Sequence, residues 1–148
     1  MKKINQLRKV LEDNNLFIKT NPEKLHIFID DGDVTATAAR SLSFEYEYQV
    51  NLIVTDYDQP IDYLMVPIIS WMYINQQEFM ANPELRKGAI KFEVEQLNNN
   101  TADVSIELKL TERVIVKSGT SGLEYKHVID EPPADLRPDW INEIWPMN

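Results

Sequence analysis

The sequence predicts an α+β fold: a mostly antiparallel, twisted sheet of about four to five strands with two main helices packed on one face. Three observations predict it. Residues 90–95 and 104–111 alternate apolar and polar side chains, as half-buried strands do. Residues 3–14 and 61–75 instead space their apolar side chains as helices do. Finally, a chain of 148 residues with 43% hydrophobic and 26% charged residues fits a single soluble core.

The first helix is expected over residues 3–14, where apolar side chains lie three and four positions apart between Lys and Arg residues. Asn21 followed by Pro22 is typical of a helix start, which predicts a short helical turn. That turn leads into a first strand over residues 25–30. The sequence DDGD at residues 30–33 is expected to end this strand, because Asp and Gly tolerate turn geometry.

The middle of the chain predicts a long strand followed by helices. Residues 41–56 form the strand, with a bulge where the alternation of its side chains slips. The helix over residues 61–75 contains Pro67, which removes one backbone hydrogen bond, so we expect a bent helix or two stacked pieces. Residues 82–88 open with Asn–Pro and close on Gly88, which predicts a short helix or turn.

The alternating segments at 90–95 and 104–111 are separated by three Asn residues, so they predict an antiparallel hairpin with one face on the core and one in water. The sequence SGTSG at residues 118–122 predicts a flexible loop, and the residues after it a short strand that pairs back along the sheet. Pro132 and Pro133 end the compact part. We therefore expect one domain over residues 1–133 and a C-terminal extension over residues 134–148.

The extension is polar but carries four large apolar residues: Trp140, Ile141, Ile144 and Trp145. A free tail would leave these side chains in water, so something should cover them. Two interpretations stand side by side. In the first, the segment folds back on its own domain. In the second, it docks on a neighbouring subunit, which makes these four residues the candidate partner interface.

Composition excludes several classes of function. The net charge of −9 repels polyanions, so we expect no specific nucleic-acid binding and favour protein partners. The chain has no Cys, which excludes disulfides, thiolate zinc sites and Cys nucleophiles. No apolar run approaches the roughly 20 residues that span a bilayer, so we expect no membrane association. The protein is expected in the cytoplasm unless a particle carries it out.

A search for chemistry predicts no catalytic residue, no cofactor and no metal ion. The DDGD sequence lacks the alternating acidic positions of a calcium loop. The two histidines, His26 and His127, lie about a hundred residues apart and outside any spaced metal motif. The four glycines form no phosphate loop. The alternative function is a small metal- or ligand-binding α/β domain or enzyme that uses His127 or the acidic side chains Asp30, Asp31 and Asp33.

Several segments of the chain, taken together, resemble the tail completion protein R family of contractile-tailed phages and their prophages. They are KTNPEKLHIFIDDG, ARSLSFEYEYQVNLIVTDYD, DYLMVPIISWMYINQ, SIELKLTERVIV and the closing IDEPP. The resemblance covers roughly residues 7–133 and fades beyond Pro133. It brings no catalytic residues with it.

The resemblance implies a structural, non-enzymatic protein with a tail-terminator-like fold. Such a protein caps the head-proximal end of the tail tube or sheath and prepares it for head joining. It also implies self-association into a ring, expected to be a hexamer, and partners among the tail tube, sheath and head–tail connector proteins. The expected location is the virion tail, after assembly in the cytoplasm of the bacterial host.

Overall fold

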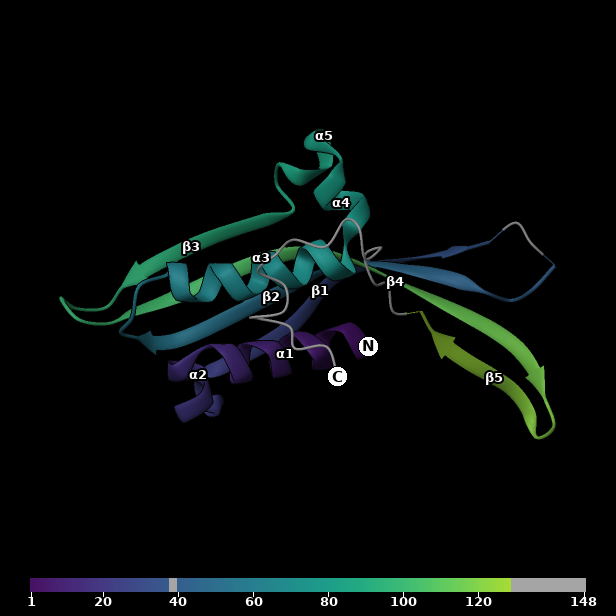
Figure 1. Cartoon of the computed structure of the whole chain (residues 1–148), viewed down its shortest axis with the longest axis horizontal. Helices are drawn as coiled ribbons and strands as arrows, with labels where there is room; N and C mark the ends of the chain where they lie inside the picture. Colours follow the sequence, from purple (N-terminus) through teal and green to yellow (C-terminus); the bar gives the residue numbers. More distant parts are fainter. Residues whose placement is uncertain (38–39, 129–148) are drawn as a thin grey trace.

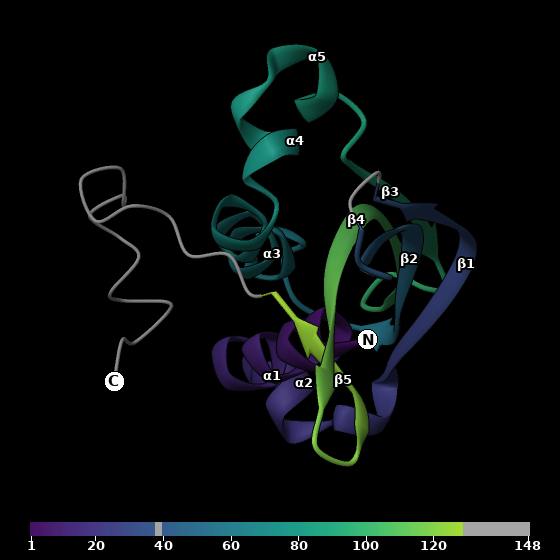
Figure 2. The same cartoon turned by 90° about the vertical axis from the view of Figure 1, so that its right-hand side faces the viewer.

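The computed structural model describes residues 1–37 and 40–128 and confirms the α+β class. Within those residues five strands form one curled antiparallel sheet, in the order β1-β2-β4-β3 with β5 also paired to β4. The long helices α1 and α3 lie on the same side of the sheet (Figures 1 and 2). The elements are α1 (Lys2–Asn14), α2 (Leu16–Thr20), a 3-10 turn (Pro22–Lys24), β1 (Leu25–Ala36), β2 (Phe44–Tyr57), α3 (Asp62–Asn75), α4 (Gln77–Ala81), α5 (Pro83–Arg86), β3 (Ile90–Gln96), β4 (Ala102–Gly119) and β5 (Gly122–His127).

The core lies between the two long helices and the central strands β2 and β4. Side chains at alternate positions of both strands point to the helices, and the register pairs Val50 with Leu108 and Leu52 with Ile106. Helix α3 inserts Trp71 from the other side, fully buried. Burying a large apolar side chain contributes about 1.5–3 kcal/mol, so this helix–sheet contact is the main source of stability.

The predicted end of the first strand is wrong. Strand β1 runs through the DDGD sequence to Ala36, and a bulge between Ile29 and Gly32 absorbs the extra residue. The Asp and Gly residues do relax the backbone, but β2 is long enough to supply a pairing partner on both sides of the bulge. The long strand predicted over residues 41–56 is confirmed as β2. Its irregularity lies only at residues 54–57, where Asp56 has a φ of 54°.

Helix α3 is a single helix and not two stacked pieces, although Pro67 lies inside it. Pro67 has no N–H to donate, so the carbonyl of Tyr63 loses its helical partner. The side-chain amide of Asn15 donates to that carbonyl at 3.1 Å. Asn15, at the junction between α1 and α2, thereby replaces the hydrogen bond that Pro67 cannot donate.

The side chain of Asn15 forms hydrogen bonds with three other residues, and only 4% of the surface of Asn15 is exposed. Its Oδ1 accepts from the backbone N–H of Ile18 at 3.0 Å, which caps α2. Its Nδ2 donates to Tyr57 Oη at 3.2 Å as well as to Tyr63. One side chain therefore ties together α1, α2, the end of β2 and the start of α3.

We expect Asn15→Ala to lower the free energy of unfolding by about 2–4 kcal/mol, because it removes a helix cap and leaves a buried carbonyl unpaired. Asn15→Asp keeps the cap but loses both donors, so its effect should be intermediate. Urea denaturation measures both variants. Asn14→Ala, at the exposed neighbouring position, is the control. A loss below about 1 kcal/mol for Asn15→Ala would contradict this role.

The remaining turns fit their sequences with one exception. In α5, Asn82 Oδ1 accepts from the N–H of Glu84 at 2.9 Å, and Gly88 has a φ of 82°, as predicted for residues 82–88. The hairpin of β3 and β4 is confirmed, and the Oδ1 of Asn98 accepts from two N–H groups of its turn. The SGTSG segment is not a flexible loop. It closes the β4–β5 hairpin through a two-residue turn at Thr120 and Ser121, and Gly122, the first residue of β5, has a φ of 121°.

Candidate functional site

A buried polar cluster joins the helices to an open stretch of β4. Within the described residues, β4 pairs with β3 up to Leu108 and with β5 from Val114, on the same edge. Between these two paired stretches of β4, the amide of the Gln76 side chain forms the backbone hydrogen bonds that a neighbouring strand would form. Thr111 N–H donates to Gln76 Oε1 at 2.9 Å, and Gln76 Nε2 donates to the Thr111 carbonyl at 3.0 Å. The ammonium of Lys3 also donates to that carbonyl.

Glu112 lies at the centre of this cluster with 1% of its surface exposed. Its Oε1 accepts from the backbone N–H of Lys3 at 2.8 Å, and its Oε2 lies 2.7 Å from Nδ1 of His127. A carboxylate at the first turn of α1 is favourable, because the helix dipole is positive there. Burial, and secondarily the charge of Glu112, raises the pKa of the Tyr48 hydroxyl.

The Glu112–His127 pair is built to hold elements together. Both carboxylate oxygens are engaged, one by the start of α1 and one by the end of β5. A substrate would have to displace one of these contacts. Glu112 is not among the residues predicted from the sequence, although the sequence contains a signal for it. It occupies an inward position in the alternating pattern of β4, between Leu110 and Val114, where an acid requires a partner.

The acidic side chains proposed for the alternative metal site do not converge. Asp30 accepts from the side chain of Asn51 at 3.0 Å, and Asp31 and Asp33 are exposed along the edge strand β1. Among residues 1–37 and 40–128, no group of three or more His, Asp or Glu side chains could hold a metal ion. The four apolar residues of the C-terminal extension lie outside the described residues.

Two hairpin arms leave the body at one end of the molecule (Figure 1). Strands β2 and β4 pair only as far as Phe44 and Val114. Beyond this point β1–β2 and β4–β5 continue as separate hairpins that point in different directions (Figure 2). The arms expose apolar side chains, and Tyr125 of β5 is 63% exposed. Their exposed edges and side chains suit contact with another protein.

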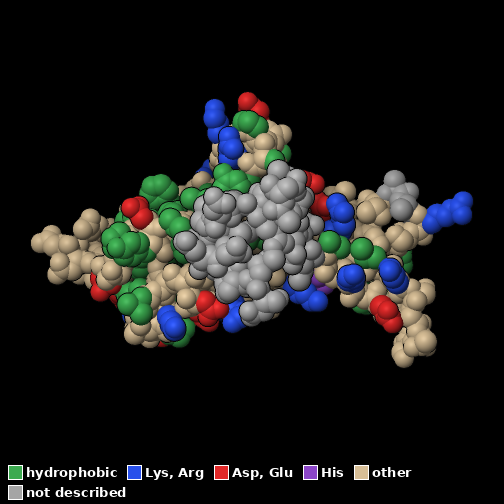
Figure 3. Space-filling view, viewed as in Figure 1, with side chains coloured by type: hydrophobic (Ala, Val, Ile, Leu, Met, Phe, Trp, Pro, Cys, Tyr) green, Lys and Arg blue, Asp and Glu red, His purple; other side chains and the backbone are tan. Residues whose placement is uncertain are grey.

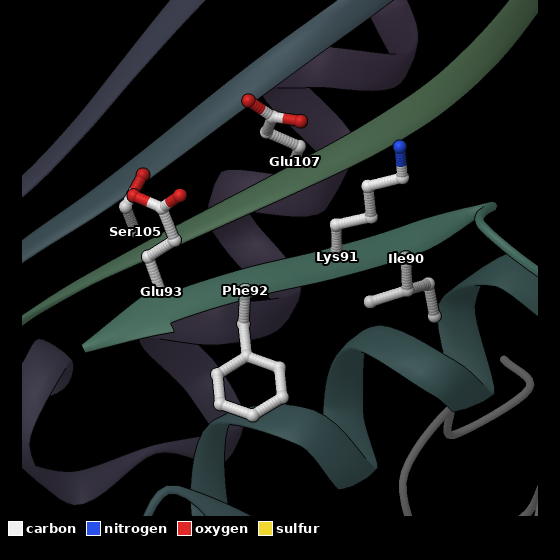
Figure 4. Close-up of a pocket in the computed structure, with 6 residues that line it drawn as sticks. All are labelled: Ile90, Lys91, Phe92, Glu93, Ser105 and Glu107. Atoms are coloured by element: carbon white, nitrogen blue, oxygen red, sulfur yellow. The ribbon is translucent and has the colours of Figure 1, made fainter.

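Strand β3 forms an edge of the sheet at the opposite end. The prediction that it is half buried is wrong, because Phe92 is 61% exposed and Val94 41%. Figure 4 shows Phe92 on the helix side of the strand and Lys91 and Glu93 on the other side, beside Glu107. The shallow hollow of about 410 Å³ here therefore surrounds a strand edge and does not enclose a ligand.

The two ends of the molecule differ in charge. The β4–β5 arm carries Lys117 and Lys126 against one acid, Glu124. In Figure 3 several Lys and Arg side chains gather at the end that carries the arms. The β3–β4 hairpin has the opposite balance, since only Lys91 is basic. Its acids are Glu93, Glu95, Asp103 and Glu107.

The outer face of α3 is apolar as well as its inner face. Tyr63, Val66, Ile69 and Tyr73 lie three or four positions apart, and all four are exposed. A hollow of about 360 Å³ lies beside the first of them, next to Asn14 and Pro67. In the described part of the chain, no helix is both long and apolar enough to cross a membrane.

A model of the P2 phage tail completion protein R family matches residues 1–132, a span that includes every described element. The chain belongs to this family. It is also similar to the tail completion protein R of Escherichia phage P2, with 39% identity over 135 residues that cover 91% of this chain and 87% of the relative. No solved structure matches the chain.

Membership in the P2 phage tail completion protein R family makes the chain a structural protein of the phage tail and not an enzyme. The predicted resemblance is thereby confirmed, and so is the tail completion role. The functional residues of such a protein are those that meet other proteins. The arms, the β3 edge and the outer face of α3 are therefore the candidate site.

Proposed function

We propose that this protein caps the head-proximal end of the phage tail tube or sheath as a ring of six copies and prepares it for joining to the head. The observation that carries the proposal is the family match over residues 1–132. Its partners would be tube or sheath subunits, connector proteins and further copies of itself. A head-to-tail contact with the right rotation closes into a ring, which ends tail growth without chemistry.

The complementary ends of the molecule support such a contact. We propose that β5 of one copy adds to the β3 edge of the next. Both strands run antiparallel to β4 on the same edge, so antiparallel addition keeps the helix side of both sheets on one side. The exposed apolar side chains of β5 then lie beside Phe92 and Val94. The basic residues of the arm meet Glu93 and Glu95 on the other side.

The net charge of −9 suits the same role. A ring at the end of the tube must let DNA pass, and an acidic wall does not retain a polyanion. Assembly would take place in the host cytoplasm, before the finished tail joins the head.

Electron microscopy of particles that lack this protein tests the proposed function. We expect tails of abnormal length or tails without heads, because growth is not capped and the head has no prepared end to bind. The wild-type gene supplied in trans should restore normal particles. Normal particles in its absence would refute the proposal, whichever surfaces the protein uses.

A further inference from the structure

We propose that residues 140–145 of the C-terminal extension pack on the outer face of α3 of the same chain. A helix that is apolar on all sides is typically buried on all sides. Helix α3 meets this description, yet Val66 on its outer face is 53% exposed and Ile69 is 38% exposed. Side chains of this kind in a continuous stripe mark a surface that another segment covers.

The sequence WINEIW has the chemistry of that segment. Its apolar residues Trp140, Ile141, Ile144 and Trp145 lie at the spacing of one helical face. Aromatic side chains bury the largest apolar areas, and two of them on a short segment suit a shallow apolar surface. The hollow beside Tyr63, Val66 and Pro67 offers a place for one of these rings.

The described chain ends close to the helix. The N–H of Val128 donates to the carbonyl of Arg113. Two residues away on β4, Thr111 is bound by Gln76, the residue directly after α3. Eleven residues, 129–139, separate Val128 from Trp140. They reach up to about 40 Å when extended, whereas the 14 residues of α3 span about 21 Å. The segment can therefore reach any part of the outer face.

The local concentration of the segment determines whether the same chain or a second copy covers the outer face of α3. A short tether holds its segment at an effective concentration in the millimolar range, about a hundredfold or more above a protein at micromolar concentration. The segment of the same chain therefore occupies the face first. This inference is independent of the proposed cap and stands or falls separately.

Cross-linking of the full-length protein tests the inference, since the chain has no Cys of its own. In the double variant Val66→Cys/Ile144→Cys, a short bismaleimide should link the two thiols within one chain. The yield of linked monomer should not change as the protein is diluted. The control Leu85→Cys/Ile144→Cys places the first thiol on α5, at an exposed position away from the stripe, and should link little.

A mixture of the two single variants, Val66→Cys and Ile144→Cys, identifies the copy involved. No linked dimer is expected from it. Linked dimers would show that a second copy supplies the segment and would overturn the inference, as would a double variant that links no better than its control. Val66 and Leu85 are both exposed, so neither substitution removes a core side chain.

Discussion

Reversing the charge on either end of the molecule should abolish self-association, and mixing the two reversed proteins should restore it. The first variant is Glu93→Lys/Glu95→Lys on β3, and the second is Lys117→Glu/Lys126→Glu on the β4–β5 arm. Each places like charges across the proposed contact when a copy meets its own kind. Like charges in an interface cost several kcal/mol, so the dissociation constant should rise about a hundredfold or more.

The mixture of the two variants should associate although each variant alone does not, because each contact joins the arm of one copy to the β3 edge of another. In a ring that alternates the two variants, every arm meets a β3 edge of opposite charge. Such a ring closes only with an even number of copies, as a hexamer does. Sedimentation velocity of each variant and of the mixture measures the effect. High salt should weaken it, because the Debye length falls to about 3 Å at 1 M salt.

Lys2→Glu/Lys9→Glu on α1 is the matched control for the arm variant, with the same change in net charge at exposed positions away from both ends. It should associate as the wild type does. If the β3 and arm variants associate normally while particles without the protein are defective, the capping function stands and the β5–β3 contact is wrong.

Replacing Glu112 with Ala should have the largest effect on stability. The substitution leaves the backbone N–H of Lys3 without its acceptor and deprives His127 of its partner. Removing one member of a buried polar pair costs about 3–5 kcal/mol. A domain of this size has about 5–15 kcal/mol in all, so urea denaturation should reveal a markedly lower midpoint.

Glu112→Gln keeps the shape of the side chain and an oxygen for the Lys3 N–H, so we expect a smaller loss. Arg113→Ala is the control one residue along the same strand, since this side chain is exposed and its ion pair with Glu45 spans 3.9 Å. That substitution should change stability by less than about 0.5 kcal/mol. Equal effects at positions 112 and 113 would contradict the anchoring role.

The sequence predicted those parts of the fold that depend on local pattern. Alternation in residues 90–111 predicts the β3–β4 hairpin, and apolar spacing predicts α1 and α3. Pairing between distant segments is not encoded locally, which is why the DDGD sequence indicates a turn although β2 holds residues 30–33 in a strand. Alternation also assigns Phe92 and Val94 to one face, but it cannot tell whether a helix covers that face.

The candidate site was less accessible to prediction. A surface that binds other proteins lacks the fixed spacing of a catalytic motif, so the arms and the β3 edge became visible only with the strands in place. Glu112 offered a local signal through its inward position. The role of Asn15 offered none, because its partners Tyr57 and Tyr63 are brought to it by the tertiary fold.

The amide of Gln76 limits how other polypeptides can add to this sheet. It forms hydrogen bonds with the backbone N–H and carbonyl of Thr111, which lies between the stretches of β4 that pair with β3 and β5. A foreign strand that adds along this edge meets a folded helix end after only six or seven residues. Long uninterrupted edges promote fibril growth, so this interruption favours a finite, closed assembly over an open-ended aggregate.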